Sequence, residues 1–291
     1  MGSGAWSSAT ATSYVTTAYA ASGVTSLDSF ATLDTSQIYQ SYTLDPMLNP
    51  YGVIRECKDS AEHPETKPII LALDVTGSMG KATKMCATQL NDIMENLYKD
   101  VSDVEFMMMG IGDLSYDSYP IQATQFESDV RILDQTTKIY FEAGGGGNSY
   151  ESYTAAWYFG LYNTDLDCWK RGKKGIIITL GDEPLNPYLP GKRLGDALGK
   201  NTQDIDTEEL YNEAIKKFDI YHIAITDRES SFANYKERIE SSWGKLLGQR
   251  CLYAKSEELP KVIKQIVDDH INGTEFTINS GIKVGKEGVS W

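Results

Sequence analysis

Short apolar runs alternate with longer stretches of helical periodicity along most of this chain. From residue 67 onward, four runs of strand length are apolar at nearly every position rather than at every second one. Such runs are typical of parallel strands that helices cover on both faces. A more polar run predicts a short edge strand, and a four-residue run predicts a last short strand. The buried runs are 68–74 (PIILALD), 104–111 (VEFMMMGI), 175–180 (GIIITL) and 219–225 (DIYHIAI), and the short ones are 121–126 and 251–254.

Apolar residues at helical spacing fill the segments between these strands. In the first segment, Met85, Leu90, Ile93, Met94 and Leu97 lie on one helical face. The alternation of strand and helix predicts an α/β fold with a doubly wound, mostly parallel, Rossmann-like sheet, helices on both faces and a short antiparallel edge strand. The expected helices are 79–97, 129–141, 150–161, 207–218, 232–247 and 256–271.

Residues 1–66 differ from the rest of the chain. They are rich in Ser, Thr, Tyr and Ala and show no strong periodicity. Their tyrosines, with Trp6, Phe30 and Leu33, exceed what a disordered tail usually carries. We therefore expect an N-terminal arm (1–66) that packs on the main domain (67–272), followed by a C-terminal tail (273–291).

Composition narrows the range of partners and compartments. The 291 residues carry a formal net charge of −14 at pH 7, which disfavours nucleic acid and anionic membranes as partners. No apolar stretch approaches the roughly 20 residues that span a bilayer, and the first 23 residues do not resemble a signal peptide. The four cysteines are widely spaced, which favours buried free thiols over disulfides. These observations predict a cytoplasmic protein. The three histidines share no zinc-ligand spacing, so the sequence gives little support for a zinc site.

Candidate chemistry lies in three loops that follow predicted strands or open a helix. In doubly wound sheets, ligands bind beyond the carboxyl ends of the strands, near the point where strand order reverses. The loops are 74–78 (DVTGS), 144–152 (GGGGNSYES) and 181–183 (GDE), and their ligand atoms are all hard oxygens. Such a set suits Mg²⁺, Mn²⁺ or Ca²⁺. In an extended segment Asp74, Thr76 and Ser78 point the same way, and Gly77 permits a tight turn after the strand.

These residues resemble the von Willebrand factor A family, whose metal-ion-dependent adhesion site begins Asp-x-Ser/Thr-x-Ser after the first strand. The motif at 74–78 matches in full, and the resemblance covers roughly residues 67–272. It implies that Thr76 and Ser78 bind Mg²⁺ directly, while Asp74 acts through water and hydrogen bonds. It also implies a further acidic ligand after the central strand, which is Asp182.

The chain departs from the family at two positions. Many members supply a ligand from a Gly-Gly-Thr loop, but 144–152 contains no Thr. This loop looks more like integrin β-type domains, which implies Glu151 as the ligand, with Asn148 and Ser149 as competitors. The third loop follows Leu180 as Gly-Asp rather than as the common Thr-Asp-Gly, so Glu183 remains an alternative to Asp182.

The resemblance implies a divalent-metal-dependent protein-binding module rather than an enzyme, with no catalytic residue. The metal is Mg²⁺, with Mn²⁺ or Ca²⁺ as alternatives, and the partner is a protein that offers an Asp or Glu carboxylate. Intracellular, bacterial-type members often act as assembly factors beside AAA-type ATPases, and we expect this role here.

Two other functions and a simpler structural role compete with this interpretation. A Mg²⁺-dependent, phosphatase-like hydrolase would use Asp74 as its nucleophile. Phosphatases of the haloacid dehalogenase group require a second Asp, two residues after the nucleophile, as general acid. This chain has Thr76 at that position. A nucleotide-binding P-loop would need Gly and Ser or Thr where Val75 and Ala82 stand. Ser78 could instead simply cap the following helix.

Overall fold

A seven-stranded sheet forms the centre of the protein. The computed structural model describes all residues except 1–3, 142–146, 201, 228, 274–282 and 285–291, and it describes only the backbone of residues 78, 229–233 and 283–284. The strand order is β11-β10-β9-β6-β2-β3-β4. The five inner strands are parallel, and both edge strands are antiparallel to their neighbours. The strands are β2 (Lys67–Asp74), β3 (Val104–Ile111), β4 (Ile121–Ala123), β6 (Gly175–Gly181), β9 (Phe218–Ile225), β10 (Cys251–Ala254) and β11 (Lys283–Val284).

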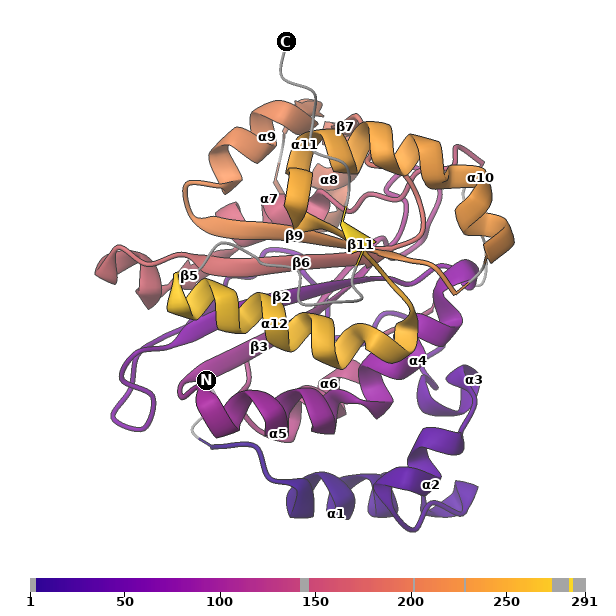
Figure 1. The fold of residues 1–291 in the computed structure, drawn as a ribbon, viewed down its shortest axis with the longest axis vertical. Coiled ribbons are helices and arrows are strands. Elements are labelled where there is room, and N and C mark those ends of the chain that lie inside the picture. Colours follow the sequence, from indigo (N-terminus) through magenta and orange to yellow (C-terminus); the bar gives the residue numbers. More distant parts are fainter. Residues whose placement is uncertain (1–3, 142–146, 201, 228, 274–282, 285–291) are drawn as a thin grey trace.

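Helices cover both faces of this sheet, as Figure 1 shows. Alternate residues of a strand point to opposite faces, so that Ile69 and Leu71 of β2 join one apolar core while Ile70 and Ala72 join the other. The first face carries α4 (Gly80–Thr88), α5 (Leu90–Asp100), α6 (Arg131–Thr136) and α12 (Leu259–Asn272). The second carries α7 (Ala155–Tyr162), α8 (Gly191–Leu198), α9 (Thr207–Ala214) and α10 (Glu229–Ile239). The doubly wound α/β fold expected from the sequence is confirmed.

The helices differ from the expected ones in several places, and the expected helices 129–141 and 207–218 are both shorter, as α6 and α9. The stretch 79–97 is two helices that meet at Gln89, and the stretch 232–247 contains a π-helical turn (Glu240–Gly244) and α11 (Lys245–Leu247) after α10. Helix α7 begins only at Ala155, because Glu151 instead forms a bridge with Leu185. Helix α8 was not expected, since its sequence GKRLGDAL contains two glycines and only two leucines as buried anchors.

Residues of the N-terminal segment pack against α4 and α5 (Figure 1). They form α1 (Ser8–Ala18), α2 (Leu27–Thr32) and α3 (Thr35–Ile38), and their buried side chains belong to the same core as α4, α5 and α12. Hydrogen bonds also join the layers: the Tyr39 hydroxyl donates to the Thr83 carbonyl at 2.8 Å, and Trp6 Nε1 donates to Asn91 Oδ1 at 3.0 Å. This segment is therefore part of the folded body.

The same segment also covers the free edge of β4. The Ala123 N–H donates to the Leu48 carbonyl at 2.9 Å, and the Arg55 guanidinium donates to the Ala123 carbonyl at 2.8 Å. These bonds occupy backbone groups that an open sheet edge would offer to another chain. Two small sheets lie outside the main one: β1 (Arg55–Cys57) with β5 (Thr164–Leu166), and β7 (Tyr188–Leu189) with β8 (Ile205–Asp206).

Two further expectations concern cysteines and the C-terminal tail. All four cysteines are buried and free, as expected. Most of the tail 273–291 lies outside the described residues, but β11 within it pairs with β10. Among the described residues, no helix has the length and apolar character needed to cross a membrane.

Candidate metal centre

The candidate site lies where β2 and β6 end side by side. These strands are parallel neighbours with Leu73 opposite Leu180, so Asp74 and Asp182 emerge at the same edge of the sheet. Strand order reverses here, because β3 follows β2 on one side while β6 lies on the other. The two acids therefore occupy the place where doubly wound sheets bind ligands.

Asp74 is fully buried, and side-chain and backbone groups of the described residues hold it with three hydrogen bonds. Its Oδ1 accepts from the Thr76 N–H at 2.8 Å and from the Thr76 hydroxyl at 2.6 Å. Its Oδ2 accepts from the Tyr153 hydroxyl at 2.8 Å. Both carboxylate oxygens are thus fixed in direction. The Thr76 hydroxyl donates a hydrogen bond to a carboxylate, which makes its oxygen more electron-rich.

Gly181 makes room for the Tyr153 hydroxyl. A Cβ atom at position 181 would lie 2.0 Å from that hydroxyl oxygen, far inside any allowed contact. This crowding gives a physical reason for the Leu-Gly-Asp sequence that departs from the family pattern. With glycine at position 181, the acid follows one residue later, at Asp182, whose side chain is 4% exposed.

Of the three candidates in the glycine-rich loop, Glu151 alone is buried beside the other acids. It is 3% exposed, and its Oε2 has no hydrogen-bond partner among the described residues. Burial, followed by repulsion from Asp74, raises the pKa of Glu151 to about 11. Asn148 is exposed, and its Oδ1 accepts from the Tyr150 N–H at 3.1 Å. Ser149 is half-buried in the left-handed region, with φ 57°.

Burial and mutual repulsion shift the other acids in the same direction. Burial, and then Asp182, raises the pKa of Asp74 to about 7. Burial, and then Asp74 and Asp182, raises the pKa of Glu183 to about 8. Asp113, which follows β3 and is 2% exposed, has an Oδ2 without a partner among the described residues. The mutual repulsion outweighs the one positive group that acts on Glu183, which is Arg238.

Asp113 was not singled out from the sequence. The available signal was its position two residues after a buried strand, at the same sheet edge as Asp74 and Asp182. Ser78 lies in the 3₁₀ turn Gly77–Met79, but its side chain is outside the described residues. The proximity of its hydroxyl to Asp74 therefore remains a prediction.

The residues present fit a hard divalent cation. In the described part of the chain, no three Asp, Glu, His or Cys side chains are placed to hold an ion together. The expected ligand set is different in kind, because it combines hydroxyls at 76 and 78 with a few carboxylates. All of its ligand atoms are oxygens, and the buried Glu151 Oε2 has no hydrogen-bond partner among the residues that the structure describes. Oxygen donors of this type suit Mg²⁺.

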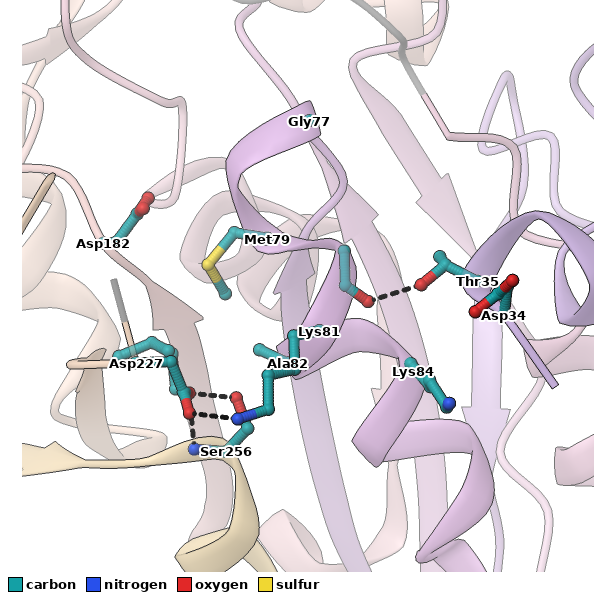
Figure 2. Close-up of a pocket in the computed structure, with 12 residues that line it drawn as sticks. Asp34, Thr35, Gly77, Met79, Lys81, Ala82, Lys84, Asp182, Asp227 and Ser256 are labelled. Atoms are coloured by element: carbon teal, nitrogen blue, oxygen red, sulfur yellow. Dashed lines mark hydrogen bonds and ion pairs between the residues drawn. The ribbon is translucent and has the colours of Figure 1, made fainter. Parts of the chain in front are cut away.

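A pocket of about 390 Å³ opens beside this edge, and its walls come from distant segments. Figure 2 shows Asp182 on one side and Asp34 and Thr35 of the N-terminal segment on the other, with the start of α4 between them. Lys81 Nζ and Asp227 Oδ1 form an ion pair at 2.9 Å along the wall. Thr35 Oγ1 donates to the Gly80 carbonyl at 2.8 Å. The N-terminal segment therefore borders the surface next to the candidate site.

Comparisons with known proteins give distant structural likenesses. No protein-family model matches the chain, and no curated protein matches it. Two structures of the pilus adhesin SpaC from Lactobacillus rhamnosus GG, one in an open conformation, match with 13% and 14% identity and TM-scores of 0.48 and 0.47. Both matches cover 77% of this chain but only 31% and 32% of the adhesin, so the chain spans about a third of its length. The conserved hypothetical protein BatB from Bacteroides thetaiotaomicron matches with 14% identity and a TM-score of 0.39, over 71% of this chain and 99% of that one.

Proposed function

We propose that this chain is a divalent-cation-dependent protein-binding module of the von Willebrand factor A type. The proposed ligands are Asp74, Thr76, Ser78, Glu151 and Asp182. One observation carries the proposal: buried acids from separate loops meet at the switch point of the sheet, raise one another's pKa, and leave the Glu151 Oε2 without a partner in the described part of the chain. The preferred cation is Mg²⁺, with Mn²⁺ and Ca²⁺ as alternatives.

Each residue has a distinct role in this proposal. Thr76 and Ser78 offer neutral hydroxyl oxygens, which add no negative charge to the site. Asp74 orients Thr76 through the two hydrogen bonds at its Oδ1, while Tyr153 fixes its other oxygen. When bound, a divalent cation supplies a local positive charge that reverses the field of the acids. The site can then accept a carboxylate from a partner protein, although the chain itself carries a net charge of −14.

The surroundings of Asp74 favour binding over hydrolysis. A nucleophilic carboxylate needs an oxygen that can reach a substrate. Asp74 is fully buried, and both of its oxygens accept hydrogen bonds from Thr76 or Tyr153. Position 76 carries a hydroxyl that donates to Asp74, rather than a carboxylic acid that could protonate a leaving group.

The partner class and the compartment follow from the resemblance in the sequence. We propose a protein partner that presents an exposed Asp or Glu, within an assembly or regulatory role beside an AAA-type ATPase. We further propose that this role is cytoplasmic. Pull-down with Mg²⁺ and with EDTA, followed by identification of the retained proteins, tests both proposals. Retention of the same proteins under the two conditions would contradict cation-dependent binding, and retained proteins that are not cytoplasmic would contradict the compartment.

Thermal unfolding with and without Mg²⁺ or Mn²⁺ tests the metal-binding part. At a free cation concentration about 100-fold above the dissociation constant, the folded state should gain about 2.7 kcal/mol. Asp182→Asn should abolish this gain. The matched control is Asp196→Asn, because Asp196 lies on α8 and pairs with Lys192 on the surface. Hydrolysis of a generic phosphate ester by the wild type and not by Asp74→Asn would instead support the phosphatase.

A further inference from the structure

A second pocket adjoins the candidate metal centre on the second face of the sheet. It has a volume of about 480 Å³. This lies within the range of about 300–1,000 Å³ that is usual for binding pockets. Its walls are the residue before Glu151, the loop after β6, the start of α9, and the π-helical turn with α11 (Figure 1). Segments far apart in the sequence therefore close around one space.

The chain connects this pocket directly to the proposed metal ligands. Tyr150 lines the pocket and is the residue before Glu151. Leu185 also lines it, forms a bridge with Glu151, and comes two residues after Glu183. Consecutive Cα atoms are about 3.8 Å apart. A partner segment that placed a carboxylate at the metal centre would therefore pass the mouth of this pocket.

Apolar side chains of the lining are accessible from solvent. Pro187 is exposed, and Tyr150 and Leu246 are half-buried. Leu185 lies deeper, at 8% exposed. An aromatic ring, a proline ring and a leucine thus offer contact surface at the wall of the pocket, outside the closed core. Such a lining suits an apolar side chain that enters from another molecule.

The wall that carries Tyr150 is held in place by its neighbours. The Arg238 guanidinium lies 4.9 Å from the centroid of the Tyr150 ring, which is a cation–π contact. The Ser242 hydroxyl donates to the Arg238 carbonyl at 2.5 Å and accepts from the Leu185 N–H at 3.2 Å. A wall that is already ordered loses little conformational freedom on binding. Single π-helical turns inside helices, like the one that carries Ser242, are frequent at functional sites.

The polar part of the lining carries both signs of charge. Ser241 and Lys245 are exposed on one wall, and Asp206 and Glu208 on the other. Asp206 Oδ1 is engaged at the start of α9, where it accepts from the Glu208 N–H at 2.8 Å. Since neither sign dominates, the pocket does not select a charged group. Its hydrogen-bonding groups instead suit an apolar ring that carries one polar atom.

We propose that this pocket receives a tryptophan or tyrosine side chain of the partner protein, close in sequence to the acid that reaches the metal centre. The ring packs on Tyr150, Pro187 and Leu246, with its polar atom toward the polar wall. An extended segment advances about 3.3 Å per residue, so the aromatic residue lies within about three residues of the acid. Aromatic side chains seated in pockets supply much of the energy of many protein interfaces. This inference rests on the proposed function and defines the partner's motif as an acid with a nearby aromatic residue.

Capture of a synthetic peptide library by the immobilised full chain tests this motif. The peptides are short, with Asp fixed at the centre and the other positions randomised, and a matched library carries Asn at the centre. In Mg²⁺, the captured Asp peptides should be enriched in Trp or Tyr at one position near the Asp. We expect an enrichment of about fivefold or more over the input library. The Asn library in Mg²⁺ and the Asp library in EDTA should not be captured.

Ser241→Trp locates the pocket. Ser241 is an exposed lining residue, so a tryptophan there should fill the space that the partner's ring would occupy. The variant should lose the aromatic enrichment but keep the Mg²⁺-dependent capture of Asp peptides. The matched control is Ser13→Trp, because Ser13 is an exposed serine of α1 that does not line the pocket. This control should enrich aromatic residues as the wild type does.

The possible outcomes separate this inference from the proposed function. Mg²⁺-dependent capture of Asp peptides without aromatic enrichment would overturn the aromatic pocket and leave the metal-dependent module standing. Aromatic enrichment that persists in Ser241→Trp would overturn the placement of the ring in this pocket. If Mg²⁺ does not increase the capture of the Asp library, the proposed function is contradicted, and the pocket's role fails with it.

Discussion

Tyr153 holds Asp74 in place through a hydrogen bond to its Oδ2. It is fully buried, donates to Asp74 Oδ2 at 2.8 Å, and makes edge contacts with the rings of His222 and Trp243. Its ring is held by packing, so its hydroxyl meets Asp74 in one geometry. Partners of this kind orient groups that bind a metal and strengthen its binding.

Tyr153→Phe should therefore weaken Mg²⁺ binding by about 10- to 100-fold. It should also destabilise the protein by about 1–3 kcal/mol, because Asp74 loses a hydrogen bond in a buried place. Isothermal titration with Mg²⁺ and urea unfolding measure the two effects. Tyr188→Phe is the control, because Tyr188 is 50% exposed. Unchanged Mg²⁺ affinity in Tyr153→Phe would show that Tyr153 does not contribute to metal binding.

His222 makes the stability of the fold depend on acid pH. Burial lowers its pKa from 6.5 to about 3, since the ring is fully buried and stacks on Trp243 at 3.9 Å. Between pH 6.5 and pH 3 the unfolded chain binds a proton at His222 and the folded chain does not. Stability should therefore fall as the pH falls through this window, by up to about 1.4 kcal/mol per pH unit.

His222→Phe keeps a ring on Trp243 and removes the titrating group. Its free energy of unfolding should depend less steeply on pH between 6.5 and 3 than that of the wild type. Asp74 and Glu183 act in the opposite direction, because their raised pKa values favour the folded state as the pH falls. Both proteins contain these two acids, so their effect drops out of the difference between wild type and variant. Parallel curves for the two proteins in urea unfolding at several pH values would show that His222 does not titrate as argued.

At the scale of elements, continuous apolar runs predicted four of the five inner strands of the sheet, and a shorter run predicted the fifth, β10. The reason is physical: a strand covered on both faces needs apolar side chains at nearly every position, and few other elements show this pattern. The two acids at the sheet edge followed from the same logic, because Asp74 is the last residue of β2 and Asp182 directly follows β6. The Tyr153–Asp74 bond could not be predicted, because it depends on how the approach to α7 packs against β6.

Helix α8 and the N-terminal helices escaped prediction for a different reason. The core anchors of α8 are only Leu194 and Leu198, and those of α1 are Ala11 and Val15. Sparse anchors give a weak periodic signal, and tertiary packing decides whether such helices form. The start of α7 was misplaced because Glu151 is drawn into a bridge with Leu185, which periodicity cannot reveal.

Packing of α2 against the body leads to a testable consequence. Phe30 is 1% exposed and lies 5.0 Å from the Tyr19 ring, centroid to centroid. Phe30→Ala should destabilise the whole protein by about 3–5 kcal/mol if the N-terminal segment and the sheet unfold together. Tyr42→Ala, at a side chain that is 92% exposed, should change stability by less than about 0.5 kcal/mol. Urea unfolding followed by tryptophan fluorescence measures both, and an early separate transition for Phe30→Ala would contradict joint unfolding.

At the scale of the whole molecule, charge is divided between the two ends of the sheet. The carboxyl ends of β2, β3 and β6 gather buried acids, and the amino ends of β2 and β6 border a cavity rich in lysine. The N-terminal segment reaches the acidic end through Asp34 and Thr35, which line the pocket beside Asp182 (Figure 2). A partner that docks at this edge would therefore touch both the candidate metal centre and the N-terminal segment.

The central claim is that one divalent cation lies between the ends of β2 and β6. Anomalous diffraction from crystals grown with Mn²⁺ tests it most directly, because the ion is located without assumptions about its ligands. We predict a single strong peak beside Thr76 and Ser78, within reach of Asp182 and Glu151. A chain that binds no Mn²⁺ at this edge, or that holds it at another place in the fold, would contradict the account.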